Sequence, residues 1–201
     1  MHPTHAFTIR LYEHIEPLDR GSRYEDPLQA AFDAGGLGTI SGGGSHLSES
    51  GEIDFAEIEV DATDGSRAIA TAIETLEAAG APQGSEIKEG SAVQRTFGQL
   101  QCLAVYLDGV SLPDEVYAAL DFDALTSALA QGAGVESYRG FWQGPQETGL
   151  YFFGRDAEAM FRGVEQVLRT VPIGQNARVV VRHGKPELKP RTVRIPRHGA
   201  T

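Results

Sequence analysis

The chain is poor in cysteine and has no long apolar run. Its one cysteine, Cys102, excludes an internal disulfide. Cys102 lies in the apolar stretch 100–107, which predicts a buried structural thiol rather than a nucleophile. No apolar run approaches the ~20 residues that span a bilayer. The first residues have neither a basic segment nor an apolar stretch of signal-peptide length, so we expect a cytoplasmic protein.

Catalytic and metal-binding signatures are also missing. The sequence contains no His-Glu-x-x-His, no Cys-x-x-Cys and no Gly-x-Ser-x-Gly. Its six histidines are scattered along the chain: His2, His5, His14, His46, His183 and His198. We therefore expect a protein that is not an enzyme and that needs no cofactor and no metal.

Basic residues are scarce outside the C-terminus. The net charge is −11, and residues 185–201 carry a local +4 from Lys185, Lys189, Arg191, Arg194 and Arg197 against Glu187, which leaves −15 for the other residues. An acidic body repels nucleic acid and favours basic partners, although acidity can also serve solubility alone. A hydrophobic content of 41% is enough to bury a core.

An internal repeat dominates the sequence. Residues 26–90 and 122–183 show the same order of elements. The first copy predicts a helix at 26–34, strands at 38–47 and 52–61, a helix at 65–79 and a strand at 86–89. The second predicts a helix at 121–131, strands at 135–143 and 149–154, a helix at 156–170 and a strand at 177–182. Pro82 and Gly84 match Pro172 and Gly174, as expected for a structural repeat.

A strand precedes each copy. Residues 6–14 alternate apolar and polar side chains, and residues 100–107 are apolar on both faces. Each half then has the order βαββαβ. The predicted fold is α+β, with tandem ferredoxin-like (βαββαβ) repeats whose antiparallel sheets are covered by helices. The predicted domains are a first half at 1–90, a linker at 91–99, a second half at 100–184 and a basic C-terminal extension at 185–201, in which residues 192–195 could add an edge strand.

A glycine run, Gly42–Gly44, lies in the second predicted strand of the chain. Glycine-rich segments can cradle phosphate, but this run has no Gly-Lys-Ser/Thr ending and does not precede a helix. Glycine within a strand indicates a bulge or the close approach of another segment. A partner that inserts a side chain over the run remains an alternative.

Carboxylates concentrate on the strand at residues 52–61. Apolar residues change parity near Ala56 and Glu57, which predicts a bulge there. With that bulge all the acidic side chains of the strand point away from the core: Glu52, Asp54, Glu57, Glu59 and Asp61. The strip is a solvated edge, a docking surface for a basic protein, or a divalent-cation site. A straight strand makes a poor cage for a cation, so we expect no metal.

Aromatic residues gather on the hairpin of the second copy. Phe141 and Trp142 are adjacent and cannot both face the core of a pleated strand, so one should be exposed or covered by the other copy. Tyrosine and tryptophan often anchor interfaces, which makes Tyr138 and Trp142 candidate partner-binding residues. Stacking on RNA would also use them, but the acidic body opposes it.

The stretch Gly42-Gly43-Gly44-Ser45-x-Leu47-x-x-x-Gly51-Glu52-Ile53, with Gly80-Ala81-Pro82-x-Gly84-Ser85 after a helix, resembles small bacterial proteins of uncharacterised type. Some of these resemble immunity proteins of polymorphic toxin systems. The resemblance covers residues 25–90 and implies an acidic, stoichiometric inhibitor without a cofactor.

Two functions follow from these patterns. The first is an acidic binding module, monomer or homodimer, that sequesters or neutralises a basic protein partner such as a toxin and binds neither nucleic acid nor membrane. The alternative is a small-ligand-binding protein or an enzyme, with a pocket between the two halves near Gly42–Gly44 and Trp142.

Overall fold

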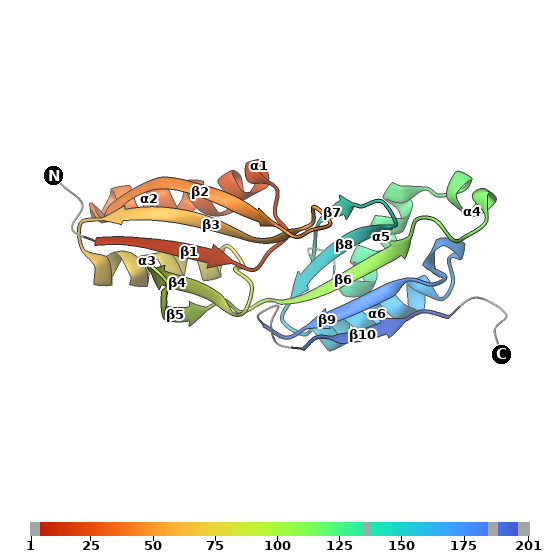
Figure 1. Ribbon diagram of the computed structural model, residues 1–201. Helices are drawn as coiled ribbons and strands as arrows, with labels where there is room; N and C mark the ends of the chain where they lie inside the picture. The colour runs from red at the N-terminus through yellow and green to blue at the C-terminus, as the bar shows by residue number, and fades with distance from the viewer. Residues whose placement is uncertain (1–4, 135–136, 185–188, 197–201) are drawn as a thin grey trace. The chain divides into compact units, whose positions relative to one another are not determined.

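The computed structural model describes residues 5–134, 137–184 and 189–196, and the chain divides into two compact units at residues 100 and 101 (Figure 1). Each unit is a five-stranded antiparallel sheet with helices on one face. No helix in the described part of the chain is long and apolar enough to cross a membrane.

The first unit follows the predicted order of elements. Its elements are β1 (His5–Leu11), α1 (Pro17–Arg20), the π-helix η1 (Gly21–Glu25), α2 (Asp26–Gly35), β2 (Gly38–Leu47), β3 (Ile53–Ala62), α3 (Gly65–Ala78), β4 (Ser85–Glu89) and β5 (Ala92–Phe97). The sheet order is β2-β3-β1-β4-β5. The first four of these strands make the antiparallel sheet of a ferredoxin-like unit, and β5 extends it.

The second unit repeats this arrangement. Its elements are β6 (Gln101–Asp108), α4 (Asp114–Ala118), α5 (Phe122–Ala133), β7 (Tyr138–Gln143), β8 (Glu147–Gly154), α6 (Ala157–Leu168), the 3-10 turn η2 (Pro172–Gly174), β9 (Arg178–Arg182) and β10 (Arg191–Arg194). The order β7-β8-β6-β9-β10 places each strand where its counterpart lies in the first sheet. The tandem ferredoxin-like fold predicted from the repeat is confirmed.

The predicted linker at 91–99 is wrong, because residues 92–97 form strand β5, which pairs with β4. This strand lies at the edge of the sheet and is exposed along most of its length, so it lacks the apolar alternation by which the other strands were predicted. The basic C-terminal segment also contains a strand, since β10 pairs with β9. Residues 185–188 and 197–201 of that segment lie outside the described residues.

Each unit has its own core between sheet and helices. In the first, Ile9 and Ile58 pack with Leu28, Phe32 and Leu76. In the second, the sheet side chains that face the helices include Leu103, Val105 and Phe152, and the helices contribute Leu125, Leu129, Val164 and Leu168. Cys102 is buried on β6, as its apolar surroundings predict.

Aspartate caps the long helices of both units. The carboxylates of Asp64, Asp121 and Asp156 each accept a hydrogen bond from the backbone N–H three residues later, at the starts of α3, α5 and α6. This bond satisfies a donor that the first turn of a helix leaves without a partner. Because caps are local in sequence, these helix starts were predicted to within one residue.

Candidate functional site

Strand β3 carries the predicted acidic strip. Ala56, Ile58, Val60 and Ala62 are buried against the helices, so the side chains between them lie on the opposite, open face of the sheet. The predicted bulge is displaced: β1 pairs with β3 without interruption through Ala56 and Glu57. The pairing of β2 with β3 has two irregularities, one at Asp54 of β3 and one at Ser41 of β2.

Basic side chains of the first unit lie beside several carboxylates of the strip. Arg10 donates to Glu57 over 2.9 Å from Nε and 2.7 Å from Nη2. His46 Nδ1 lies 3.5 Å from Asp54. His14 Nδ1 lies 3.5 Å from Glu52, whose side chain is only 16% exposed. Glu52 is therefore the least exposed of the carboxylates that have a basic side chain nearby.

The ring of Phe55 contacts two of these basic side chains. The Arg10 guanidinium lies 3.9 Å from the ring centroid, and the His46 ring stacks on Phe55 at 4.7 Å with an interplanar angle of 9°. Arg10 and His46 thus each contact both the aromatic ring and a carboxylate. The ring face stabilises the charged guanidinium of Arg10.

Glu59 and Asp61 are different. No basic nitrogen among the described residues lies within 4.0 Å of either carboxylate. Together with Thr8 and Ser41 they line a shallow hollow of about 210 Å³ on the open face of the first sheet. Within the described residues, this pair of carboxylates therefore has no basic partner, and it lies beside two hydroxyl groups.

The glycine run makes room for side chains of this chain. A Cβ on Gly42 would lie 2.7 Å from Oε2 of Glu59, and one on Gly43 would lie 3.4 Å from both Arg20 and Glu25. Arg20 donates to Glu25 over 2.6 Å. The close approach of other segments, which the sequence indicates as one reason for glycine in a strand, accounts for both residues.

The aromatic candidates belong to the second unit. Tyr138 packs on Phe152 with ring centroids 5.5 Å apart, and burial, reinforced by Asp123, raises the pKa of its hydroxyl. Trp142 is half-buried, and its ring lies over Gly144. Phe141 is 51% exposed. Of the adjacent pair, Phe141 is thus the exposed residue within its unit, and Tyr138 is partly buried against the core.

The formal charge differs between the units. Residues 101–201 contain 11 acidic and 11 basic residues, so the net −11 of the chain falls entirely on residues 1–100. Metal ligation does not account for the acidity of the described residues, which include no group of three Asp, Glu, His or Cys side chains placed to hold an ion.

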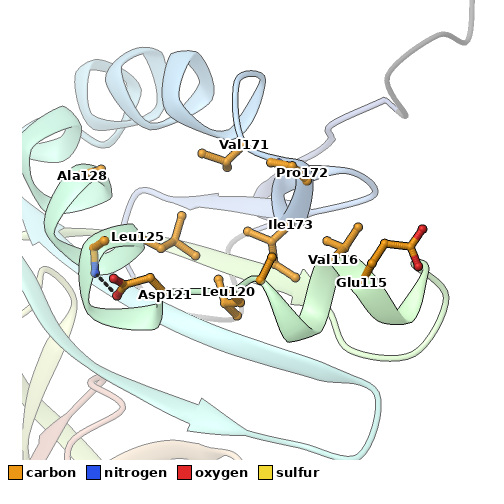
Figure 2. A pocket seen from close by; sticks show the side chains of 11 residues that line it. Glu115, Val116, Leu120, Asp121, Leu125, Ala128, Val171, Pro172 and Ile173 are labelled. Carbon is orange, nitrogen blue, oxygen red and sulfur yellow. Dashed lines mark hydrogen bonds between the residues drawn. The ribbon is translucent and has the colours of Figure 1, made fainter.

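The second unit contains a pocket that sequence reasoning missed. It has a volume of about 410 Å³ and lies between α4, α5 and the turn that joins α6 to β9 (Figure 2). It is lined by Glu115, Val116, Ala119, Leu120, Asp121, Ala124, Leu125, Ala128, Val171, Pro172 and Ile173. No local motif predicts it, because its walls come from segments about fifty residues apart in sequence.

A hydrogen-bonded loop ties the walls of this pocket together. Asp108, at the end of β6, accepts from the backbone N–H groups of Val110 (3.0 Å) and Ser111 (2.8 Å) and from the Asn176 side chain (3.0 Å). Asn176 adopts a left-handed backbone (φ 62°) just after the η2 wall. Asparagine tolerates this conformation better than most residues. In this conformation the Asn176 amide lies against the loop that leads into α4.

This network predicts a pH dependence. Partial burial alone would raise the pKa of Asp108, but the hydrogen bonds from Ser111, Val110 and Asn176 hold it well below its usual value. The folded state therefore favours the carboxylate, and the stabilisation is present above the unfolded pKa of about 3.9 and lost as pH falls through the folded pKa. Asp108→Asn should be less stable than wild type at pH 7, and this difference should shrink below about pH 4.

Urea denaturation at a series of pH values measures this difference. Asp114→Asn removes the same charge at an exposed position and should leave stability at pH 7 unchanged. A gap between wild type and Asp108→Asn that stays constant down to pH 2 would contradict the assignment.

Comparison with known proteins adds likeness in structure only. No family model and no curated protein matches the chain. An unknown protein from Galdieria sulphuraria is 12% identical, with 88% of this chain and 96% of that chain covered and a TM-score of 0.27. The regulatory subunit of aspartate kinase from Thermus thermophilus is 15% identical, with 81% and 92% covered and a TM-score of 0.27.

The first two RRM domains of the yeast poly(U) binding protein Pub1 are 14% identical, with 88% of this chain and 98% of that chain covered and a TM-score of 0.23. The fold assignment rests on the strand order and connectivity of the two units, and no function is transferred from these proteins.

Proposed function

We propose that this chain is a protein-binding module that sequesters a basic partner through the open face of its first sheet. The observation that carries the proposal is the hollow in which Glu59 and Asp61, with no cation from the described parts of the chain, lie next to Ser41 and Thr8. A lysine or arginine side chain of a partner matches this set of acceptors, because charge-assisted hydrogen bonds to carboxylates are stronger than neutral ones.

The charge of the first unit supports the same function. A formal −11 on residues 1–100 attracts a basic surface over distances of about 10 Å at moderate salt. Such attraction mainly speeds association and selects among partners. Neighbouring carboxylates that carry their own cation, Glu57 above all, contribute less to binding because the partner would have to replace Arg10.

The resemblance of residues 25–90 to immunity proteins makes a toxin the first partner to test. An inhibitor of that class acts by stoichiometric binding, which requires no cofactor and no catalytic residue. The proposal therefore needs only a complementary surface, and the hollow supplies its most specific part.

Capture experiments with paired variants test the proposal. The double variant Glu59→Gln/Asp61→Asn removes the two charges of the hollow. The control Glu16→Gln/Glu74→Gln removes two charges from exposed positions, one just before α1 and one on α3. Tagged protein should retain one stoichiometric basic partner from native lysate, less at high salt. The first variant should bind that partner about tenfold to hundredfold more weakly, whereas the control should stay within about twofold.

Titration of the captured partner by calorimetry gives these affinities. If both variants weaken binding equally, the affinity depends on overall charge, and the hollow is not the binding site. Unchanged affinity in both would contradict docking on this face.

A further inference from the structure

The pocket of the second unit occupies a place that the first unit fills with its own side chain. In the first unit, Tyr24 of η1 is completely buried ahead of α2, and its hydroxyl lies 3.4 Å from the carbonyl oxygen of Gly80, where α3 leads into β4. In the second unit, the corresponding space between the first helices and the turn after α6 is open.

The side chains that line this space are too small to fill it. Alanines contribute from both helices (Ala119, Ala124 and Ala128), and no aromatic side chain lines the pocket. Figure 2 shows Leu120, Leu125 and Ile173 converging on the space, with Val171 and Pro172 opposite α5. A volume of about 410 Å³ is ample for one aromatic side chain and lies within the ~300–1,000 Å³ of binding pockets.

The surroundings of the pocket are acidic. Residues 96–134 contain no lysine, arginine or histidine, and Asp114, Glu115 and Asp123 are exposed on α4 and α5. Within the described parts of the chain, no cation lies within 4.0 Å of these three carboxylates. Glu115 stands at one end of the pocket with its carboxylate turned outward (Figure 2).

The polar groups of the lining favour a protein segment over a small molecule. Small-molecule sites place a few convergent polar groups that orient the ligand. Here the lining offers only two carboxylates, and that of Asp121 already accepts the Ala124 N–H over 2.9 Å. A protein segment with one large apolar side chain would match the apolar interior of the pocket. Basic residues on either side of that side chain would match the carboxylates around the pocket.

We propose that this pocket binds one aromatic or large aliphatic side chain of a protein segment that also carries lysine or arginine. The inference goes beyond the function proposed for the first unit and does not depend on it, since the two sites share no residue. Burial of the anchor would supply most of the affinity, and the carboxylates of the rim would select for basic neighbours.

Labelled peptides test the proposal directly. The probes are a short lysine-rich peptide with one central tryptophan, the same peptide with alanine in its place, and a glutamate-rich peptide with the tryptophan. Fluorescence anisotropy should show the first to bind at least about tenfold more tightly than either of the others. The methyl resonances of Val116, Leu120, Leu125 and Ile173 should shift with the first peptide only.

A variant that fills the pocket sharpens the test. Ala128→Leu adds volume to the pocket wall and should weaken the tryptophan peptide at least about tenfold without lowering Tm. The variant Glu59→Gln/Asp61→Asn should bind the tryptophan peptide as tightly as wild type does. This result would show that the pocket acts independently of the hollow in the first unit. Equal affinity for the tryptophan and alanine peptides would overturn the inference. It would also be overturned if free indole shifted the same methyl resonances at the peptide's concentration.

Discussion

Replacing Glu13 by alanine is expected to lower the free energy of unfolding by about 2–4 kcal/mol, because it removes a completely buried carboxylate together with its charge-assisted hydrogen bonds. The Glu13 side chain is 0% exposed. Its carboxylate accepts from Arg23 over 2.6 Å and from the Tyr24 hydroxyl over 2.5 Å. These bonds hold the π-helix η1 to the segment that follows β1, so their loss should loosen η1 as well. Urea denaturation of the purified variant measures the change.

Two further variants make that measurement interpretable. Glu16→Ala removes a nearby exposed carboxylate and should cost less than about 0.5 kcal/mol. Tyr24→Phe keeps the buried ring but deletes one donor, and it should cost about 1–2 kcal/mol. If Glu13→Ala lowers the free energy of unfolding no more than Glu16→Ala does, the hydrogen bonds of Glu13 to Arg23 and Tyr24 contribute nothing net to folding.

The second large effect is expected at Gly163, where α6 crosses α5. A Cβ on Gly163 would lie 1.9 Å from the backbone oxygen of Gly132, so the two helices would have to separate. Gly163→Ala should therefore destabilise the protein by about 1–3 kcal/mol, the range for overpacking. Helix propensity alone predicts the opposite sign, a gain of about 1 kcal/mol.

The sign of the change therefore decides whether the helices contact each other at this point. Chemical denaturation of Gly163→Ala should be compared with that of Arg162→Ala, an exposed neighbour on the same helix, which should change stability by less than about 0.5 kcal/mol. A stabilised Gly163→Ala would show that α5 and α6 have room to accept a methyl group.

The fold could be predicted where the signals are local. Strand β2 has the predicted bounds, and α3 and α6 begin within one residue of prediction because aspartate caps mark their starts. Helical segments with few apolar residues were missed. The segment Pro17–Glu25 presents one large exposed apolar side chain, Leu18. Its helical turns therefore have no periodic apolar pattern from which they could be predicted.

The candidate sites were less predictable because they depend on register and on side-chain volume. The acidic strip was found in the sequence, but Arg10 and His46 reach its carboxylates only through cross-strand pairing with β1 and β2. The pocket of the second unit arises from the absence of a large side chain at one point between α4, α5 and the turn after α6, which leaves no pattern along the chain.

The distribution of charge in the second unit has a consequence for how it meets other molecules. Its acidic stretch includes α5, which packs against β7 and β8, whereas every basic residue except Arg139 follows β8 in the sequence. A body with no net charge but separated poles has an electric dipole. The field of an approaching charged molecule exerts a torque on this dipole but little net attraction. Within a Debye length of about 10 Å, the orientation of the second unit toward that molecule is therefore partly set before contact.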